Sequence, residues 1–146
     1  MNTKWLHTTL FSTAFIFSCQ MVLAEDIARE FIISPADQAV VESPVTIKFG
    51  LENMEVSPAG VENPKGGHHH LLVDVALPSD LTLPIPADEH HIHFGKGQTE
   101  TTLELSPGKH TLQLLLGDYI HRPHGKPVYS EVITITVKEK TAKEKK

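Results

Sequence analysis

Two short groups of histidines are the residues of this sequence best suited to carry chemistry. The chain has ten histidines, and six of them lie within residues 68–70 and 90–93. In a β-strand, side chains two residues apart share a face and lie roughly 6.5–7 Å apart. Two such pairs occur, His68 with His70 and His91 with His93. Imidazoles bind metals at about 2.0–2.1 Å, so each pair can hold one ion between its rings. A site made of nitrogen ligands alone suits zinc, copper(II) or nickel.

Connections between the expected strands add further candidates. If the strands alternate up and down, three connections that carry polar side chains meet at one end of the domain, where binding residues commonly gather. The preferred metal ligands are His68, His70, His93 and His121, followed by His91 and His124. The auxiliary side chains, which lie near the ion or orient an imidazole, are His69, Asp118, Glu100 and Met54. Ligating imidazoles must be neutral, so the metal affinity is expected to fall as the pH drops through about 6.5.

The histidines also have a structural interpretation. Loop imidazoles often bond to backbone groups, and buried polar groups are usually satisfied. Strand alternation turns His69 toward the face of Leu71 and Val73, which is expected to be the core, and His90 is expected to be a solvated loop residue. His110 falls at the opposite end of the domain, where a structural role is expected.

Three hypotheses follow from these histidines. The first is a carrier, buffer or chaperone for copper(II) or zinc, whose expected partners are the metal ion and another envelope protein. The second is an envelope binding or scaffolding module with a structural histidine network. The third is a metalloenzyme of the superoxide dismutase kind, which requires an open coordination position. The first hypothesis is preferred.

Motifs for other chemistry are absent from the sequence. There is no Gly-x-Ser-x-Gly, no phosphate-binding glycine loop and no His-Glu-x-x-His. Ser57, His68 and Asp74 have the residue types of a catalytic triad, but their spacing does not support one. A binding protein is therefore expected rather than an enzyme.

The first 24 residues have the pattern of a signal peptide. Lys4 provides a positive charge, residues 10–17 form an apolar run, and Val22-Leu23-Ala24 fits a signal peptidase cleavage site. The run is shorter than the roughly 20 apolar residues that span a bilayer. The sequence therefore predicts export to the periplasm. Acylation of Cys19 is the less favoured alternative, because the bulky Phe17 lies next to such a site.

The composition of the remaining 122 residues excludes several functions. Removing Lys4 from the 13 basic residues leaves 12, against 18 acidic ones. This negative balance argues against nucleic acid as a partner. The mature chain has no cysteine, which excludes disulfides and thiolate metal sites. Its single methionine argues against copper(I) held by thioethers. Residues 138–146 mix Lys and Glu, and a charged, disordered tail is expected there.

Short alternating runs between Pro, Gly, Asp and Asn predict an all-β domain over residues 25–137. Seven strands at this spacing favour an immunoglobulin-like antiparallel sandwich. In the last strand, Ile133, Ile135 and Val137 are expected to face the core. The predicted strands are Glu30–Ser34, Val45–Leu51, His69–Ala76, His91–Gly95, Thr101–Leu105, His110–Leu116 and Val128–Val137.

Several motifs together resemble a bacterial family of small exported proteins catalogued as a domain of unknown function. The resemblance covers about Ile33 to Val137. It implies a periplasmic protein of a Gram-negative bacterium and supplies no activity. The motifs are Met54-Glu-Val-Ser-Pro-Ala-Gly60, Gly67-His-His-His-Leu-Leu72, His91-Ile-His-Phe-Gly-Lys-Gly-Gln-Thr-Glu100, Pro107-Gly-Lys-His-Thr-Leu-Gln-Leu114 and Asp118-x-x-His121.

Two looser likenesses concern copper. Ser34-Pro-Ala-Asp-Gln-Ala-Val-Val41 is similar to the opening of periplasmic copper-resistance proteins of the CopC type, which are also small β-sandwiches. Those proteins typically use a mature N-terminal histidine as a copper ligand, whereas this mature chain would begin at Glu25. His91-Ile-His93-Phe-Gly95 resembles the His-x-His strand of copper/zinc superoxide dismutases. This chain lacks their cysteine pair and their long zinc loop.

Overall fold

The computed structural model of this protein describes residues 26–139. The predicted signal peptide (residues 1–24), with Cys19, lies outside the described residues, as do residues 140–146 of the predicted tail. Over residues 26–139 the fold is all-β and contains no helix. The described chain therefore offers no helical segment of the length and apolar character needed to cross a membrane.

Residues 26–139 form nine strands, two more than the sequence predicts. The additional strands, β2 and β4, contain only two residues each, too few for an alternating pattern to reveal them. The strands are β1 (Arg29–Ser34), β2 (Val40–Val41), β3 (Val45–Glu52), β4 (Glu55–Val56), β5 (Gly66–Val73), β6 (His91–His93), β7 (Glu100–Leu103), β8 (Gly108–Gly117) and β9 (Ile133–Val137).

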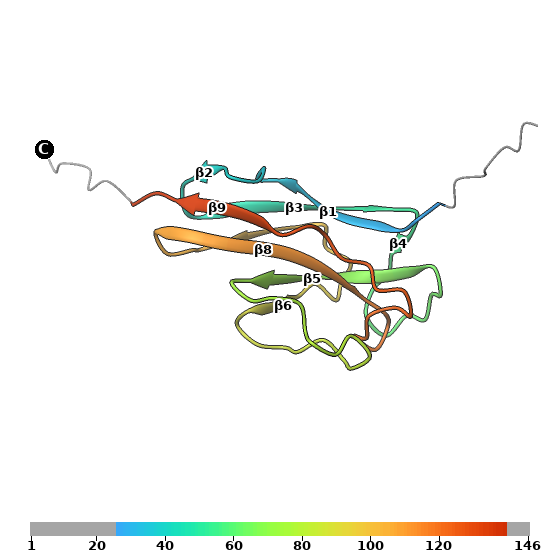
Figure 1. The fold of residues 1–146 in the computed structure, drawn as a ribbon. Helices are drawn as coiled ribbons and strands as arrows, with labels where there is room; N and C mark the ends of the chain where they lie inside the picture. The colour runs from blue at the N-terminus through green and yellow to red at the C-terminus, as the bar shows by residue number, and fades with distance from the viewer. Residues whose placement is uncertain (1–25, 140–146) are drawn as a thin grey trace, which may run out of the picture.

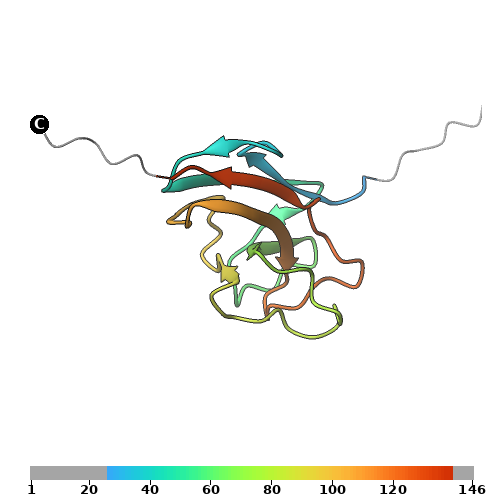
Figure 2. The same cartoon turned by 60° about the vertical axis from the view of Figure 1, so that its left-hand side comes forward.

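The strands form two sheets that lie one above the other (Figure 1). The smaller sheet has the order β1-β3-β7, and the larger one has the order β2-β9-β8-β5-β4, with β6 also paired to β5. Figure 2 shows the same two layers from a second direction. Apolar side chains from both sheets fill the space between them. The buried members are Val45, Ile47, Phe49, Leu71, Val73, Phe94, Leu112, Leu114, Ile135 and Val137.

The last strand confirms the predicted inward face, because Ile135 and Val137 are buried and Ile133 packs against the core. Its start is later than predicted, at Ile133 rather than Val128. Residues 128–132 still run beside β8, where the backbone N–H of Leu116 donates to the carbonyl of Val128. Regular pairing begins only after this stretch.

The strand β5 starts three residues earlier than predicted, at Gly66 rather than His69. Its first two residues, Gly66 and Gly67, pair in parallel with β4. A side chain at Gly66 would overlap Asn63, whose Nδ2 would lie 2.5 Å from its Cβ. Glycine here therefore permits close strand pairing rather than ending the strand. As a consequence, His68 belongs to a strand and not to a loop.

The strand β5 lies inside the larger sheet and is buried on both faces. It pairs with β8 along one edge and with β6 along the other. On the face turned away from the sandwich core, Leu72 packs with Leu115 and Ile85. The chain between β5 and β6 supplies this cover, and Val75, Leu77 and Leu81 complete it. This second face of β5 is the one that carries the clustered histidines.

Candidate metal centre

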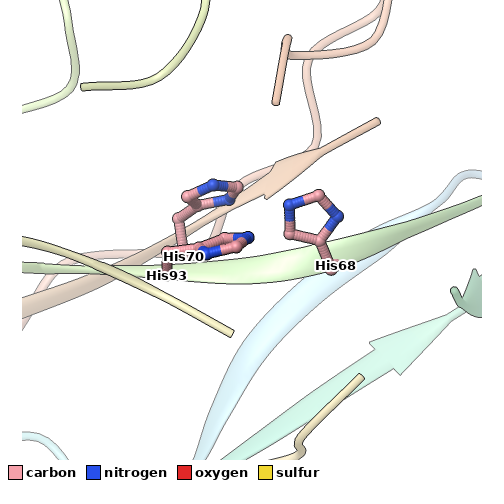
Figure 3. Close-up of side chains that lie close together, drawn as sticks. All are labelled: His68, His70 and His93. Carbon is pink, nitrogen blue, oxygen red and sulfur yellow. The ribbon is translucent and has the colours of Figure 1, made fainter. Parts of the chain in front are cut away.

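Four imidazoles meet on the outer face of the larger sheet. His68 and His70 alternate with core-facing residues of β5, and His93 on β6 stands directly opposite His70 in the strand register. Figure 3 shows the rings of His68, His70 and His93 gathered on one side of β5. The ring of His121 joins them from the segment after β8. The centroids of the six ring pairs are 4.7 to 5.9 Å apart.

Three of these rings lie close enough together that they could hold a metal ion. One ring nitrogen from each of His68, His70 and His93 lies within 4.8 Å of the others. In a tetrahedral zinc site, ligands at about 2.0–2.1 Å from the ion are about 3.4 Å from one another. Small side-chain rotations would bring the three rings to that spacing. All three potential ligand atoms are imidazole nitrogens, and the group contains no carboxylate. Such a ligand set suits a transition metal.

Burial is unequal across the four histidines. His68 and His70 are 0% and 1% exposed, whereas His121 is half-buried and His93 is exposed. Both ring nitrogens of His68 and Nδ1 of His70 are buried without a hydrogen-bond partner within residues 26–139. Buried polar atoms are normally paired, so three such atoms in one small volume require an explanation. A bound ion would satisfy one nitrogen of each ring.

The electrostatic surroundings keep the buried imidazoles neutral. Burial, helped by the nearby rings of His93 and His121, lowers the pKa of His68 to about 4. Burial and the neighbouring imidazoles lower the pKa of His70 to about 3. Burial also lowers the pKa of His93. Neutral imidazole is the form that binds metals, so His68 and His70 are already in that form at neutral pH.

His121 is placed by a tight turn that Asp118 organises. The Asp118 carboxylate accepts hydrogen bonds from the backbone N–H groups of Ile120 and Arg122, both at 2.9 Å. The backbone N–H of His121 in turn donates to the carbonyl of Asp118. His121 has a φ of 66°, in the left-handed region that non-glycine residues seldom occupy. The turn directs the imidazole back to His93, and the two Nε2 atoms lie 3.2 Å apart.

Two glycines make room for the rings. A Cβ at Gly117 would lie 2.6 Å from Cε1 of His70 and 3.0 Å from its Nδ1. A Cβ at Gly95 would lie 2.5 Å from Nε2 of His93. Neither glycine has a positive φ, so these positions need glycine for space and not for backbone freedom.

A pocket of about 220 Å³ opens onto the cluster. The imidazoles of His70, His93 and His121 form one side of it. Residues Pro84–Ala87, from the segment that covers the sheet, form the other. Ile85 is buried and packs on Leu72 and Leu115, which anchors this wall to the sheet. The cluster is thus accessible from the side where His93 and His121 stand.

His69 faces the opposite way, into the sandwich core. Its Nδ1 lies 2.6 Å from Oε1 of Glu30 on β1, and both side chains are fully buried. Burial raises the pKa of Glu30 well above its usual value and lowers that of His69 to about 4. We therefore assign an uncharged pair, in which the protonated carboxyl of Glu30 donates to His69. This pair joins the two sheets, and His69 is not available to an ion at the cluster.

Other candidates also lie apart from the four rings. His91 shares the strand of His93, but its Nδ1 lies 2.8 Å from Oδ1 of Asp88. Glu100 belongs to the smaller sheet, where it pairs with Lys48. His124 and Met54 line a different pocket, at the end of β3 and the start of β5. Of the predicted auxiliary residues, Asp118 shapes the turn of His121 and acts on His68 through its charge, and His69 acts on His68 only through a smaller charge effect.

His110 has the expected structural role. Its Nδ1 lies 2.7 Å from Oδ2 of Asp74, and its Nε2 donates to the carbonyl of Ser106 at 2.8 Å. Burial opposes protonation, but the two hydrogen bonds and the charge of Asp74 together raise the pKa of His110. This imidazole lies at the far end of β8 from Gly117.

Sequence reasoning missed two glycines beside the cluster and the partner of His69. Gly95 and Gly117 carry no chemistry, and only the close ring packing shows why they are glycine. Glu30 lies 39 residues from His69, and its surrounding pattern is that of an ordinary strand. The available signal was weak: a lone acidic residue stands among the apolar and aromatic residues of the first predicted strand.

Comparison with known proteins identifies the family but no activity. Residues 47–138 match the family described as "Domain of unknown function (DUF4399)", and the chain belongs to that family. The match spans β3 to β9 and includes all four clustered histidines. No curated protein and no solved structure matches the chain.

Proposed function

We propose that this member of the DUF4399 family binds copper(II) or zinc in the periplasm, as a carrier, buffer or chaperone. The ligands are His68, His70, His93 and His121. The observation that carries the proposal is the set of buried, unpartnered ring nitrogens on His68 and His70. Export rests on the signal-peptide pattern of residues 1–24.

The cluster differs in energy from an ordinary structural network. Leaving a buried donor or acceptor unsatisfied costs about 1–3 kcal/mol for each group. A fully paired structural histidine bonds through both ring nitrogens, as His110 does with Asp74 and Ser106. His69, in contrast, pairs only its Nδ1, with Glu30, and leaves its Nε2 without a partner in the described part of the chain. The nitrogens of His68 instead meet other imidazoles, whose arrangement becomes favourable when an ion lies between them. This contrast within one chain favours ligands over structural histidines.

An immunoglobulin-like topology is part of the same proposal. The order β1-β3-β7 corresponds to strands A, B and E of such a sandwich, and β9-β8-β5 corresponds to G, F and C. The strand β6 then takes the place of C′ beside C. In this arrangement the ligands stand on the outer face of the G-F-C sheet.

Calorimetric titration of the purified protein with zinc and with copper(II) tests the proposal. We expect one ion per chain, and His68→Ala or His93→Ala should weaken binding by more than the roughly 10–100-fold that loss of an orienting partner costs. His91→Ala is the matched control, because His91 shares the strand of His93 but bonds to Asp88. The control should bind as the parent does.

Two results would refute a metal-binding function. One is binding only at millimolar concentrations. The other is binding that alanine at His68 and His93 leaves unchanged. A third pattern would favour the scaffolding hypothesis. In that case the parent binds no specific metal, and His68→Ala and His93→Ala lower only the melting temperature, as expected for structural histidines.

A further inference from the structure

We propose that the metal centre has an exchangeable coordination position at the pocket, where a small anion replaces His121 on the ion. This inference rests on the proposed function and adds a ligand class to it. His68, His70 and His93 would hold the ion permanently. His121 would be the fourth ligand only while no external donor is bound.

The first support is a difference in how the four histidines are held. His68 and His70 belong to β5, which is paired along both edges, and His93 stands on β6 opposite His70. His121 belongs to no strand; a turn between residues 118 and 122 holds it. Three ligand atoms from the strands already lie within 4.8 Å of one another, and this set does not include His121. An ion can therefore be held before His121 engages.

The second support is the position of the pocket. His121 lines it together with His70 and His93, so a molecule in the pocket approaches the ion from the side that His121 occupies. The remaining lining, residues 84–87, is Pro-Ile-Pro-Ala. These residues provide no charged side chain, so a ligand there would be held mainly by the metal. The volume of about 220 Å³ limits the ligand to a small molecule.

The third support is charge. The three potential ligands are imidazoles, which carry no negative charge, and no carboxylate belongs to the group. A divalent ion would therefore carry a charge that its own ligands do not offset, beside the apolar side chain of Ile85, and the Asp118 charge that reaches His68 offsets it only in part. An isolated charge is costly in such surroundings, and an anion in direct contact offsets that cost. The favoured external ligand is therefore anionic.

The test uses cobalt(II) as the metal and azide as the anion, with visible absorption as the readout. Cobalt(II) is first titrated into the parent protein, His121→Ala and His90→Ala. His90 is an exposed imidazole outside the cluster and serves as the matched control. We expect all three proteins to bind one cobalt ion. Azide should then change the absorption spectrum of each in a saturable way.

Azide should bind His121→Ala about tenfold more tightly than the parent, because an internal ligand at millimolar effective concentration no longer competes. His90→Ala should match the parent. Equal azide affinity in the parent and His121→Ala, or no spectral change in either protein, would overturn the exchangeable position. Failure of the parent to bind cobalt, zinc or copper(II) would instead overturn the proposed function. Circular dichroism and the cobalt stoichiometry verify that His121→Ala is folded.

Discussion

The Nε2 atoms of His93 and His121 lie 3.2 Å apart, although 28 residues separate them in the chain. One ring comes from a strand of the larger sheet and the other from a turn beyond β8. Their meeting adds His121 to three strand histidines and completes the four-imidazole cluster. The contact also marks the side of the cluster that faces the pocket.

The glycines beside the rings give a prediction about site geometry. Gly117→Ala and Gly95→Ala should each weaken zinc binding by about tenfold or more, because the added methyl group displaces the ring of His70 or His93. Gly125→Ala is the matched control, since a Cβ there meets nothing within 4 Å. Zinc calorimetry on the three variants provides the comparison. Equal affinities in all three would show that the ring positions seen here do not matter for binding.

The pH dependence of metal affinity should differ from that of an exposed histidine site. For exposed imidazoles, affinity falls below about pH 6.5, because protons compete with the metal. Burial lowers the pKa of His68 to about 4 and that of His70 to about 3, so both remain neutral well below that pH. The expected loss of affinity for these two ligands therefore moves below the pH of about 6.5 expected from the sequence.

We therefore expect no loss of zinc affinity from these two residues between pH 7 and about 5, followed by a steep fall toward pH 4. Titrations at half-unit steps, with a competing chelator of known pH dependence, measure the profile. A midpoint near 6.5 would mean that His68 and His70 are solvated in the metal-free protein. His91→Ala again serves as the control, and its profile should overlie that of the parent.

The buried pair of Glu30 and His69 gives a prediction about stability. Since burial raises the pKa of Glu30, its carboxyl group is protonated and donates a neutral hydrogen bond. Glu30→Gln keeps a donor at the same place and should lower the free energy of unfolding by less than about 1 kcal/mol. Glu30→Ala leaves His69 unpaired and opens a cavity, which should cost about 2–4 kcal/mol.

Urea unfolding of the two Glu30 variants at pH 7 distinguishes these cases. If Glu30→Gln were as destabilising as Glu30→Ala, the pair would carry charges and the assigned proton position would be wrong. Neither change should alter zinc affinity strongly, because His69 points away from the cluster.

Local patterns were sufficient to predict most of the fold. The alternation of β9 correctly identified its buried face, because one side of the strand packs on the core and the other does not. The spacing of His68 and His70 correctly placed both on one face. The two-residue strands β2 and β4 could not be predicted, because they depend on neighbours distant in the sequence.

The site was only partly predictable for the same reason. His68, His70, His93 and His121 were expected to converge on loops at one end of the sandwich. They converge instead on a sheet face, because β5 begins at Gly66 and β6 joins the same sheet. The separation of His124, Met54 and Glu100 from the cluster depends on loop paths and sheet membership, and neither is encoded in local spacing.

X-ray absorption at the zinc edge of the zinc-loaded protein tests the central claim most directly. It measures the donor atoms, their distances from the ion and the multiple scattering that imidazole rings produce. We predict three or four imidazole nitrogens at about 2.0–2.1 Å, with any remaining donor being a small anion or water. A first shell dominated by oxygen, or one with fewer than three imidazoles, would contradict the assignment of this cluster as the metal centre.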